Sequence, residues 1–118
     1  MAKKKRRGRC HYFEERFANL DELDRFYYEN MGKKIPRETL EHERAHYDKA
    51  CELGHEAEFE LRYGRNCFTR ITIKLKGNVS EQDLIAIAKA PKNPSWEDEM
   101  TAKNARERQE RVLLENLG

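Results

Sequence analysis

The sequence predicts a small α+β domain that is rich in helix. Three observations favour this class: apolar residues recur at helical spacing in several segments, two stretches between residues 56 and 75 alternate apolar with polar side chains, and glycine or proline separates the segments. The chain has 118 residues, of which 39% are charged and 37% hydrophobic, so it has room for one modest core. We therefore expect one minimal domain over residues 10–118.

The first nine residues form a basic tail with six positive charges: Lys3, Lys4, Lys5, Arg6, Arg7 and Arg9. Such a block repels itself, so we expect residues 1–9 to be disordered. The block could also bind the phosphates of a nucleic acid. No aromatic residue and no further basic cluster extends it, which favours a solubilising tail over a nucleic-acid partner.

An arm and a first helix follow the tail. Residues 10–18 mix aromatic with charged side chains and are expected to form a short strand or an arm laid on the body. Asn19 or Asp21 can cap a helix that runs to about Asn30, and Gly32 ends it. The apolar spacing of this segment is typical of a helix that packs on a core.

A second helix is expected from Pro36 to Leu53, because proline suits a first helical turn and Gly54 suits the position after the last. His42 and His46 fall on the stripe of this helix that also carries its apolar residues. Two imidazoles that face a core need a polar partner, and a metal ion supplies one.

The alternating stretches, Glu56–Tyr63 and Thr69–Leu75, predict the two strands of an antiparallel hairpin over about residues 56–75. The N-terminal arm could add a third strand to this short sheet. Ser80 can cap a short helix, and Ser95 can cap a long C-terminal helix over about residues 96–117.

His42-Glu43-Arg44-Ala45-His46 is the most informative motif for chemistry. On a helix, residues four apart share a face with Cβ atoms roughly 6 Å apart, so both imidazoles can bind one divalent metal. Glu43 then stands where a general base can take a proton from a metal-activated water. The motif predicts a zinc hydrolase; the alternative is a solvated, charged helix in which two histidines happen to lie one turn apart.

A catalytic zinc needs a third protein ligand, and the first turn of the last helix offers three acids. Asp98 shares its helix face with small apolar residues, so its carboxylate is expected to point into the protein. Glu97 ranks second, and Glu99 stays open as a further alternative. His55 follows the end of the second helix and is expected at the surface.

These residues belong to a longer pattern: His42-Glu43-x-x-His46-x-x-x-Ala50-x-x-Leu53-Gly54, then an alternating strand, then Ala88-x-Ala90-Pro91 and Asp98-x-x-x-Ala102. Over roughly residues 36–106 the pattern resembles the peptidase domain of membrane-bound AAA proteases and its small stand-alone relatives, and also the soluble minigluzincins. The AAA-protease resemblance implies an aspartate as third zinc ligand, here Asp98, and the minigluzincin resemblance implies a glutamate, here Glu97 or Glu99. Two departures are Arg44, where these families carry a small or apolar residue, and the lack of an ATPase module.

We therefore expect a metallopeptidase-like domain that binds zinc through His42, His46 and Asp98 and uses Glu43 as general base. A peptide or protein substrate could pair with the edge of the 56–75 hairpin, and Tyr47 or Tyr63 is a candidate for stabilising the oxyanion.

Two features leave alternatives open. Cys10 and His11 could fold across the cleft with the N-terminal arm and keep the enzyme latent, since either is a competent zinc ligand. The function could also be that of a non-catalytic zinc-binding module, or of a nucleic-acid-associated protein that uses the basic tail.

Composition indicates the compartment. The longest apolar run, Leu84–Ala88, is far too short to span a membrane, and no apolar segment follows the basic start. Three cysteines at unrelated spacings are typical of reduced thiols. We expect a cytoplasmic protein.

Overall fold

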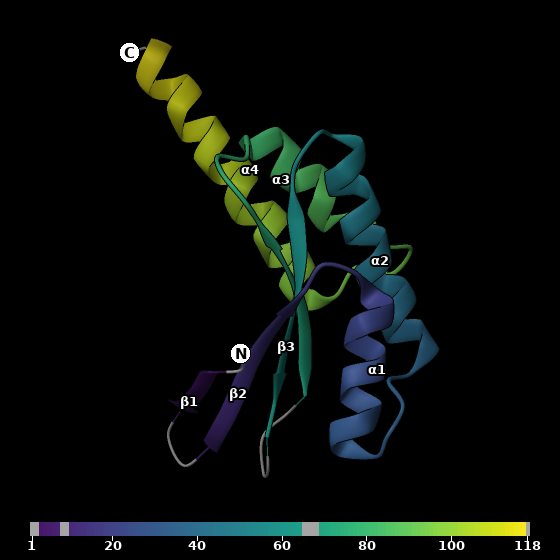
Figure 1. Ribbon diagram of the computed structural model, residues 1–118. Helices are drawn as coiled ribbons and strands as arrows, with labels where there is room; N and C mark the ends of the chain where they lie inside the picture. Colours follow the sequence, from purple (N-terminus) through teal and green to yellow (C-terminus); the bar gives the residue numbers. More distant parts are fainter. Residues whose placement is uncertain (1–2, 8–9, 65–68, 118) are drawn as a thin grey trace.

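The computed structural model describes residues 3–7, 10–64 and 69–117, and side chains over residues 11–64 and 69–109. The described elements are four strands and four helices, in the order β1 (Lys3–Arg7), β2 (Cys10–Phe17), α1 (Leu20–Met31), α2 (Arg37–Glu52), β3 (Ala57–Tyr63), β4 (Arg70–Leu75), α3 (Glu81–Ala88) and α4 (Trp96–Leu117). Figure 1 shows this mixture of helices and one sheet, and the predicted α+β class is confirmed. No helix in the described part of the chain is long and apolar enough to cross a membrane.

The four strands form one antiparallel sheet in the order β1-β2-β3-β4. The predicted hairpin is present as β3 and β4, with Leu61 opposite Ile71. The N-terminal arm is a strand, β2, which pairs with the other side of β3. Among the strands that the structure describes, none pairs with the outer edge of β4.

The basic N-terminal segment differs from its prediction. Where a disordered tail is expected, Lys3–Arg7 forms strand β1 and pairs with β2, so that Lys3 stands opposite Glu14. Backbone pairing with β2 stabilises a segment that would repel itself in isolation. Residues 1–2 and 8–9 lie outside the described residues.

Helices α1 and α2 pack on one face of the sheet and enclose the core. Leu23, Phe59 and Leu61 are the largest fully buried side chains. The core cluster around them consists of Leu20, Leu23, Tyr27, Ile35, Phe59, Leu61 and Ile71. Asn19 caps α1 as predicted by accepting a hydrogen bond from the backbone N–H of Glu22 at 2.9 Å, and Gly32 ends it with φ 67°.

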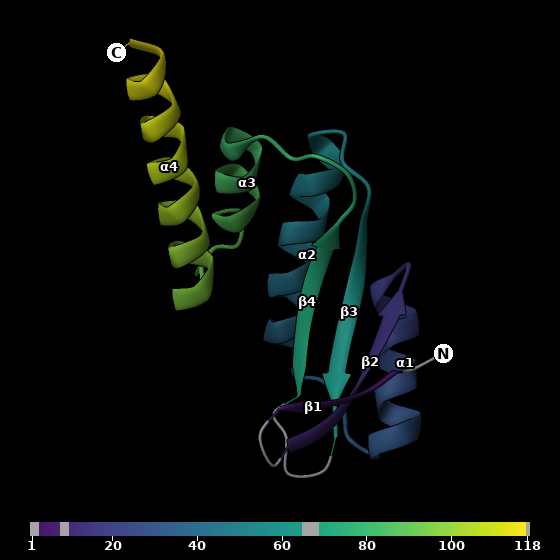
Figure 2. The same cartoon turned by 90° about the vertical axis from the view of Figure 1, so that its left-hand side faces the viewer.

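Helices α3 and α4 form a further layer, in which α3 lies between α2 and α4 (Figure 2). Ala102 and Ala105 of α4 are completely buried, because small side chains let the two helices approach closely. This layer brings the start of α4 to the side of α2 that carries the two histidines.

Candidate metal centre

Helix α2 supplies the first half of the site. It starts directly after Pro36, whose carbonyl oxygen accepts hydrogen bonds from the backbone N–H groups of Thr39 and Leu40 at 3.0 and 3.2 Å. The rings of His42 and His46 therefore lie one turn apart on one face, with centroids 4.9 Å apart and planes at 81°. The side chain of His46 is 8% exposed and that of His42 is 23% exposed. Both imidazoles turn inward, so the solvated alternative does not describe them.

Helix α4 supplies the second half through its first turn. Ser95 and Asp98 form a reciprocal cap: Ser95 donates its backbone N–H to Asp98 Oδ2 at 2.9 Å, and Asp98 donates its own to Ser95 Oγ at 3.1 Å. This cap fixes the carboxylate in one orientation toward α2. Ser95 was predicted as the cap, and the Ser-x-x-Asp spacing also carried the signal for the reciprocal bond.

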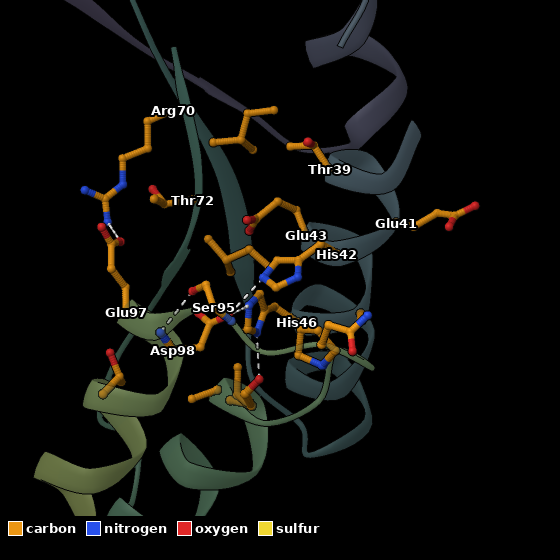
Figure 3. A pocket seen from close by; sticks show the side chains of 18 of the residues that line it. Thr39, Glu41, His42, Glu43, His46, Arg70, Thr72, Ser95, Glu97 and Asp98 are labelled. Carbon is orange, nitrogen blue, oxygen red and sulfur yellow. Dashed lines mark hydrogen bonds and ion pairs between the residues drawn. The ribbon is translucent and has the colours of Figure 1, made fainter. Parts of the chain in front are cut away.

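The two halves meet at one carboxylate oxygen (Figure 3). Asp98 Oδ2 lies 2.9 Å from His42 Nε2 and 3.2 Å from His46 Nε2. Two ligands of a tetrahedral zinc stand about 3.3 Å apart when the bonds are roughly 2.0–2.1 Å long. One ligand atom from each of the three residues lies within 4.8 Å of the others, and among the described residues this is the group that could hold a metal ion.

The hydrogen bond of His46 to α3 points to a cation at this place. Its Nδ1 lies 2.7 Å from the carbonyl oxygen of Ile87, which can only accept, so Nδ1 carries a hydrogen. In a neutral ring Nε2 then has a bare lone pair, and it faces the carboxylate oxygen of Asp98 at 3.2 Å. Two acceptors at that distance need a proton or a metal ion between them. Metal-bound histidines commonly donate their other N–H to a carbonyl in this way, so the donor set fits a metal.

The charge of Asp98 suits the same role. Burial alone would raise the pKa of its carboxyl, but hydrogen bonds from Ser95, the nearby charge of His46 and the contact with His42 outweigh it, so the pKa lies below its ordinary value of 3.8. Asp98 is therefore an anion at neutral pH.

Glu43 lies beside this group and faces the same cavity (Figure 3). Burial, with a smaller effect from the negative charge of Asp98, raises the pKa of its carboxyl to about 8, and Arg70 acts in the opposite direction. A divalent cation next to Glu43 would act in the same direction as Arg70 and lower this pKa, because positive charge favours the ionised form. The carboxyl is thus placed to exchange a proton near neutral pH.

The cavity is an open cleft of about 1340 Å³. Its walls are the edge strand β4, the face of α2 that carries the motif, the α3 helix, and the start of α4 with the segment before it. Arg70 of β4 and Glu97 of α4 form an ion pair between two of these walls. The candidate metal-binding group therefore lines a groove that also has the strand β4 as a wall.

The other candidate ligands lie elsewhere. Glu97 is engaged by Arg70, and Glu99 is exposed; neither belongs to the group that could hold a metal. Arg44, the unusual residue of the motif, is exposed and lies 3.9 Å from Asp21 of α1. It therefore leaves the cleft open.

His55 is not the surface residue that the sequence predicts. Its side chain is only 15% exposed, and its Nε2 lies 2.7 Å from Asp83 Oδ2 at the start of α3. The prediction is wrong because α3 packs against the end of α2, a tertiary contact that helix periodicity does not contain.

The proposed oxyanion residues lie away from the cleft. Tyr47 stacks on Phe59 with centroids 4.8 Å apart, and Tyr63 stacks against Phe13 at 5.5 Å. Neither tyrosine lines the cavity. Both are packing residues.

The N-terminal arm does not cross the cleft either. It forms β2, which pairs with β3 on the side opposite β4. His11 is exposed, and the side chain of Cys10 lies outside the described residues. The hypothesis of a latent enzyme closed by this arm is therefore not supported.

Sequence reasoning missed two groups at the site. One is the Ile87 carbonyl, which orients His46; a backbone oxygen leaves no residue-type signal. The other is Arg70, a guanidinium in the cleft wall, which sequence alone shows only as a charge at the start of a strand.

Comparison of the chain with protein-family models, with curated proteins and with solved structures finds no significant match. The assignment of a function therefore depends on the geometry of the site.

Proposed function

We propose that this protein is a zinc-dependent peptidase in which His42, His46 and Asp98 hold the metal and Glu43 is the general base. The observation that carries the proposal is the convergence of two imidazole nitrogens on one carboxylate oxygen, at 2.9 and 3.2 Å, in the lining of a groove that Glu43 also lines. Two imidazoles and a carboxylate are a donor set that suits zinc.

Zinc bound there would lower the pKa of a water molecule and polarise the carbonyl group of the substrate. Glu43 would accept the proton of the attacking water at its carboxylate and deliver it to the leaving amine. Its partly buried position supports this cycle: burial raises the pKa of the carboxyl to about 8 without metal, and the nearby zinc would lower it, so that the carboxylate could take a proton and return it. Asp98 balances positive charge, and the Ile87 carbonyl keeps His46 in the tautomer that presents Nε2.

The substrate class follows from the groove. The outer edge of β4, with which no described strand pairs, offers backbone N–H and C=O groups to an extended peptide, which would add to the sheet as another strand. The cleft of about 1340 Å³ also exceeds the roughly 300–1000 Å³ that small-molecule sites occupy. Both features favour a peptide or an unfolded protein segment.

Glu43→Gln tests the proposal, because the amide keeps the shape of the side chain and cannot accept the proton. We expect the variant to bind zinc as the wild type does and to lose at least about a hundredfold in kcat on a fluorogenic peptide library. Glu52→Gln is the matched control: it lies in the same helix, is exposed and does not line the cleft, so it should keep full activity. Equal turnover by Glu43→Gln and wild type would contradict the assignment.

A second candidate is a structural zinc that joins helices. The site favours it in one respect, since Asp98 connects α4 to α2 across the cleft. The same variants separate the two functions: a structural site retains zinc in wild type and in Glu43→Gln, and the wild type cleaves no peptide of the library.

A further inference from the structure

The metal-binding group is divided between two helices that α3 separates. His42 and His46 belong to α2, and Asp98 belongs to α4. Any shift of α3 relative to α2 therefore changes the distance between the imidazoles and the carboxylate. The contacts of α3 decide how well the site is preformed.

Helix α3 is attached through one histidine to α2 and through another to the segment directly after α2. At its C-terminal end the carbonyl of Ile87 accepts from His46 Nδ1 at 2.7 Å. At its N-terminal end Asp83 Oδ2 lies 2.7 Å from His55 Nε2. The first contact involves a candidate ligand itself, whereas the second lies away from the cleft and lines none of its walls.

Both members of the His55–Asp83 pair are fixed by their own backbones. Asp83 donates its backbone N–H to Ser80 Oγ at 3.1 Å in the cap of α3. His55 donates its backbone N–H to the carbonyl of Ala50 at 2.9 Å, after Gly54 has turned the chain with φ 86°. Because both residues are held by backbone hydrogen bonds, the contact between their side chains also fixes the position of α3.

Helix α3 is also attached to α4. Ala102 and Ala105 are fully buried where α4 packs on α3. Arg108 adds a bidentate ion pair, with Nε 3.1 Å from Glu81 Oε1 and Nη2 3.0 Å from Oε2. The first turn of α4, which carries Asp98, therefore follows the position of α3.

We propose that the His55–Asp83 pair is a positioning device for the metal centre: it holds α3 on α2 and so sets the place of Asp98 relative to the two imidazoles. The inference rests on the metal site of the proposed function. His55 and Asp83 touch neither the metal nor a substrate in this arrangement. Their role is to preform the site, which lowers the cost of ordering it when the metal binds.

Zinc and cobalt affinities of Asp83→Asn and His55→Gln test the inference in the full chain, by competition with a chromophoric chelator. The matched control is Glu58→Gln, which removes an ion pair with Lys76 of 2.9 Å at a comparably buried glutamate on the sheet. We expect each pair variant to bind zinc about tenfold more weakly, as loss of groups that orient metal ligands commonly does, and the control to bind within twofold of wild type. The visible spectrum of the cobalt form should change in the pair variants alone.

The thermal midpoints of the metal-free proteins separate positioning from plain stability. Similar losses of midpoint in Asp83→Asn and Glu58→Gln, with weaker zinc binding in Asp83→Asn only, support the proposal. If Asp83→Asn does not fold, Asp83→Glu replaces it; this variant keeps the charge, displaces the carboxylate and should weaken zinc binding at least about threefold.

Zinc affinities of the folded pair variants within twofold of wild type would overturn this inference and leave the proposed function standing. A wild type that binds no zinc would overturn both.

Discussion

Among the described residues, histidines contact aspartates at two places, and the two places differ in their balance of hydrogen-bond donors and acceptors. Just after α2, one ring nitrogen of His55 faces one oxygen of Asp83, so a single donated N–H accounts for the contact. At the cleft, two imidazole nitrogens contact one oxygen of Asp98, and His46 already donates its Nδ1–H to the carbonyl of Ile87. An excess of hydrogen-bond acceptors at one point distinguishes the candidate metal site from an ordinary contact between helices. The pairing of a histidine with an aspartate does not by itself do so.

Replacing the histidine of each contact should give the largest difference between them. We expect His46→Ala to weaken zinc binding by at least about a thousandfold, because one of three protein ligands is lost. His55→Ala should weaken it only about tenfold, because this residue acts through α3. Chelator competition measures both, and His42→Ala serves as a second, less buried ligand variant.

Equal zinc affinities of His46→Ala and His55→Ala would remove the distinction between the two contacts. A circular dichroism spectrum like that of the wild type is the control for folding.

Removal of the metal should lower the thermal stability only in proteins whose metal site in the cleft is intact. Zinc at about a thousand times its Kd stabilises a folded protein by about 4 kcal/mol, which for a chain of this size raises the Tm by roughly 10–20 °C. Thermal unfolding with zinc and with a chelator measures the shift. His46→Ala should show none, and a wild type whose Tm is the same in both conditions would contradict a metal bound to the folded state.

The two caps allow a finer comparison, since Ser95 fixes Asp98 and Ser80 fixes Asp83. Ser95→Ala and Ser80→Ala should each lower the free energy of unfolding of the metal-free protein by about 1 kcal/mol, the usual value of such a cap. Zinc binding should weaken more in Ser95→Ala, because the lost hydroxyl of Ser95 holds the backbone of the ligand Asp98 itself, whereas Ser80 acts only through α3. Stronger weakening by Ser80→Ala would reverse our assignment of direct and indirect roles.

The smallest effect concerns pH in the metal-free protein. A carboxyl whose folded-state pKa lies below its ordinary value of 3.8 stabilises the fold above that pH, and the contribution is lost as the pH falls through the lowered pKa. Asp98→Asn should therefore cost about 1 kcal/mol or less at pH 7, and this cost should shrink below about pH 4. Denaturant titrations of both proteins with chelator at pH 7 and pH 3 check the sign; a cost that grows on acidification would contradict it.

Many features of this molecule could be predicted because each of them depends on the residues of a single segment. The helix with His42 and His46 on one face and the inward direction of Asp98 follow from the helical period, and the hairpin of residues 56–75 follows from strand alternation. Periodicity even ranked Asp98 above Glu97, because only Asp98 shares the face that α4 buries. The structure brings together the three predicted ligands of the first choice.

The features that escaped prediction depend on which elements meet. His55 is largely covered because α3 packs near the end of α2, and the basic segment is placed by the edge of β2. The carbonyl of Ile87 acts through its position alone, and any residue could supply it. Tertiary contacts of this kind leave no mark in the spacing of the residues that make them.

X-ray absorption at the zinc K-edge of the zinc-loaded protein tests the central claim most directly. We predict one zinc per chain with a first shell of nitrogen and oxygen near 2.0–2.1 Å and the outer-shell scattering of two imidazoles, reduced to one or lost in His46→Ala. A spectrum without imidazole scattering, or equal zinc content in wild type and His46→Ala, would contradict a metal held by His42, His46 and Asp98.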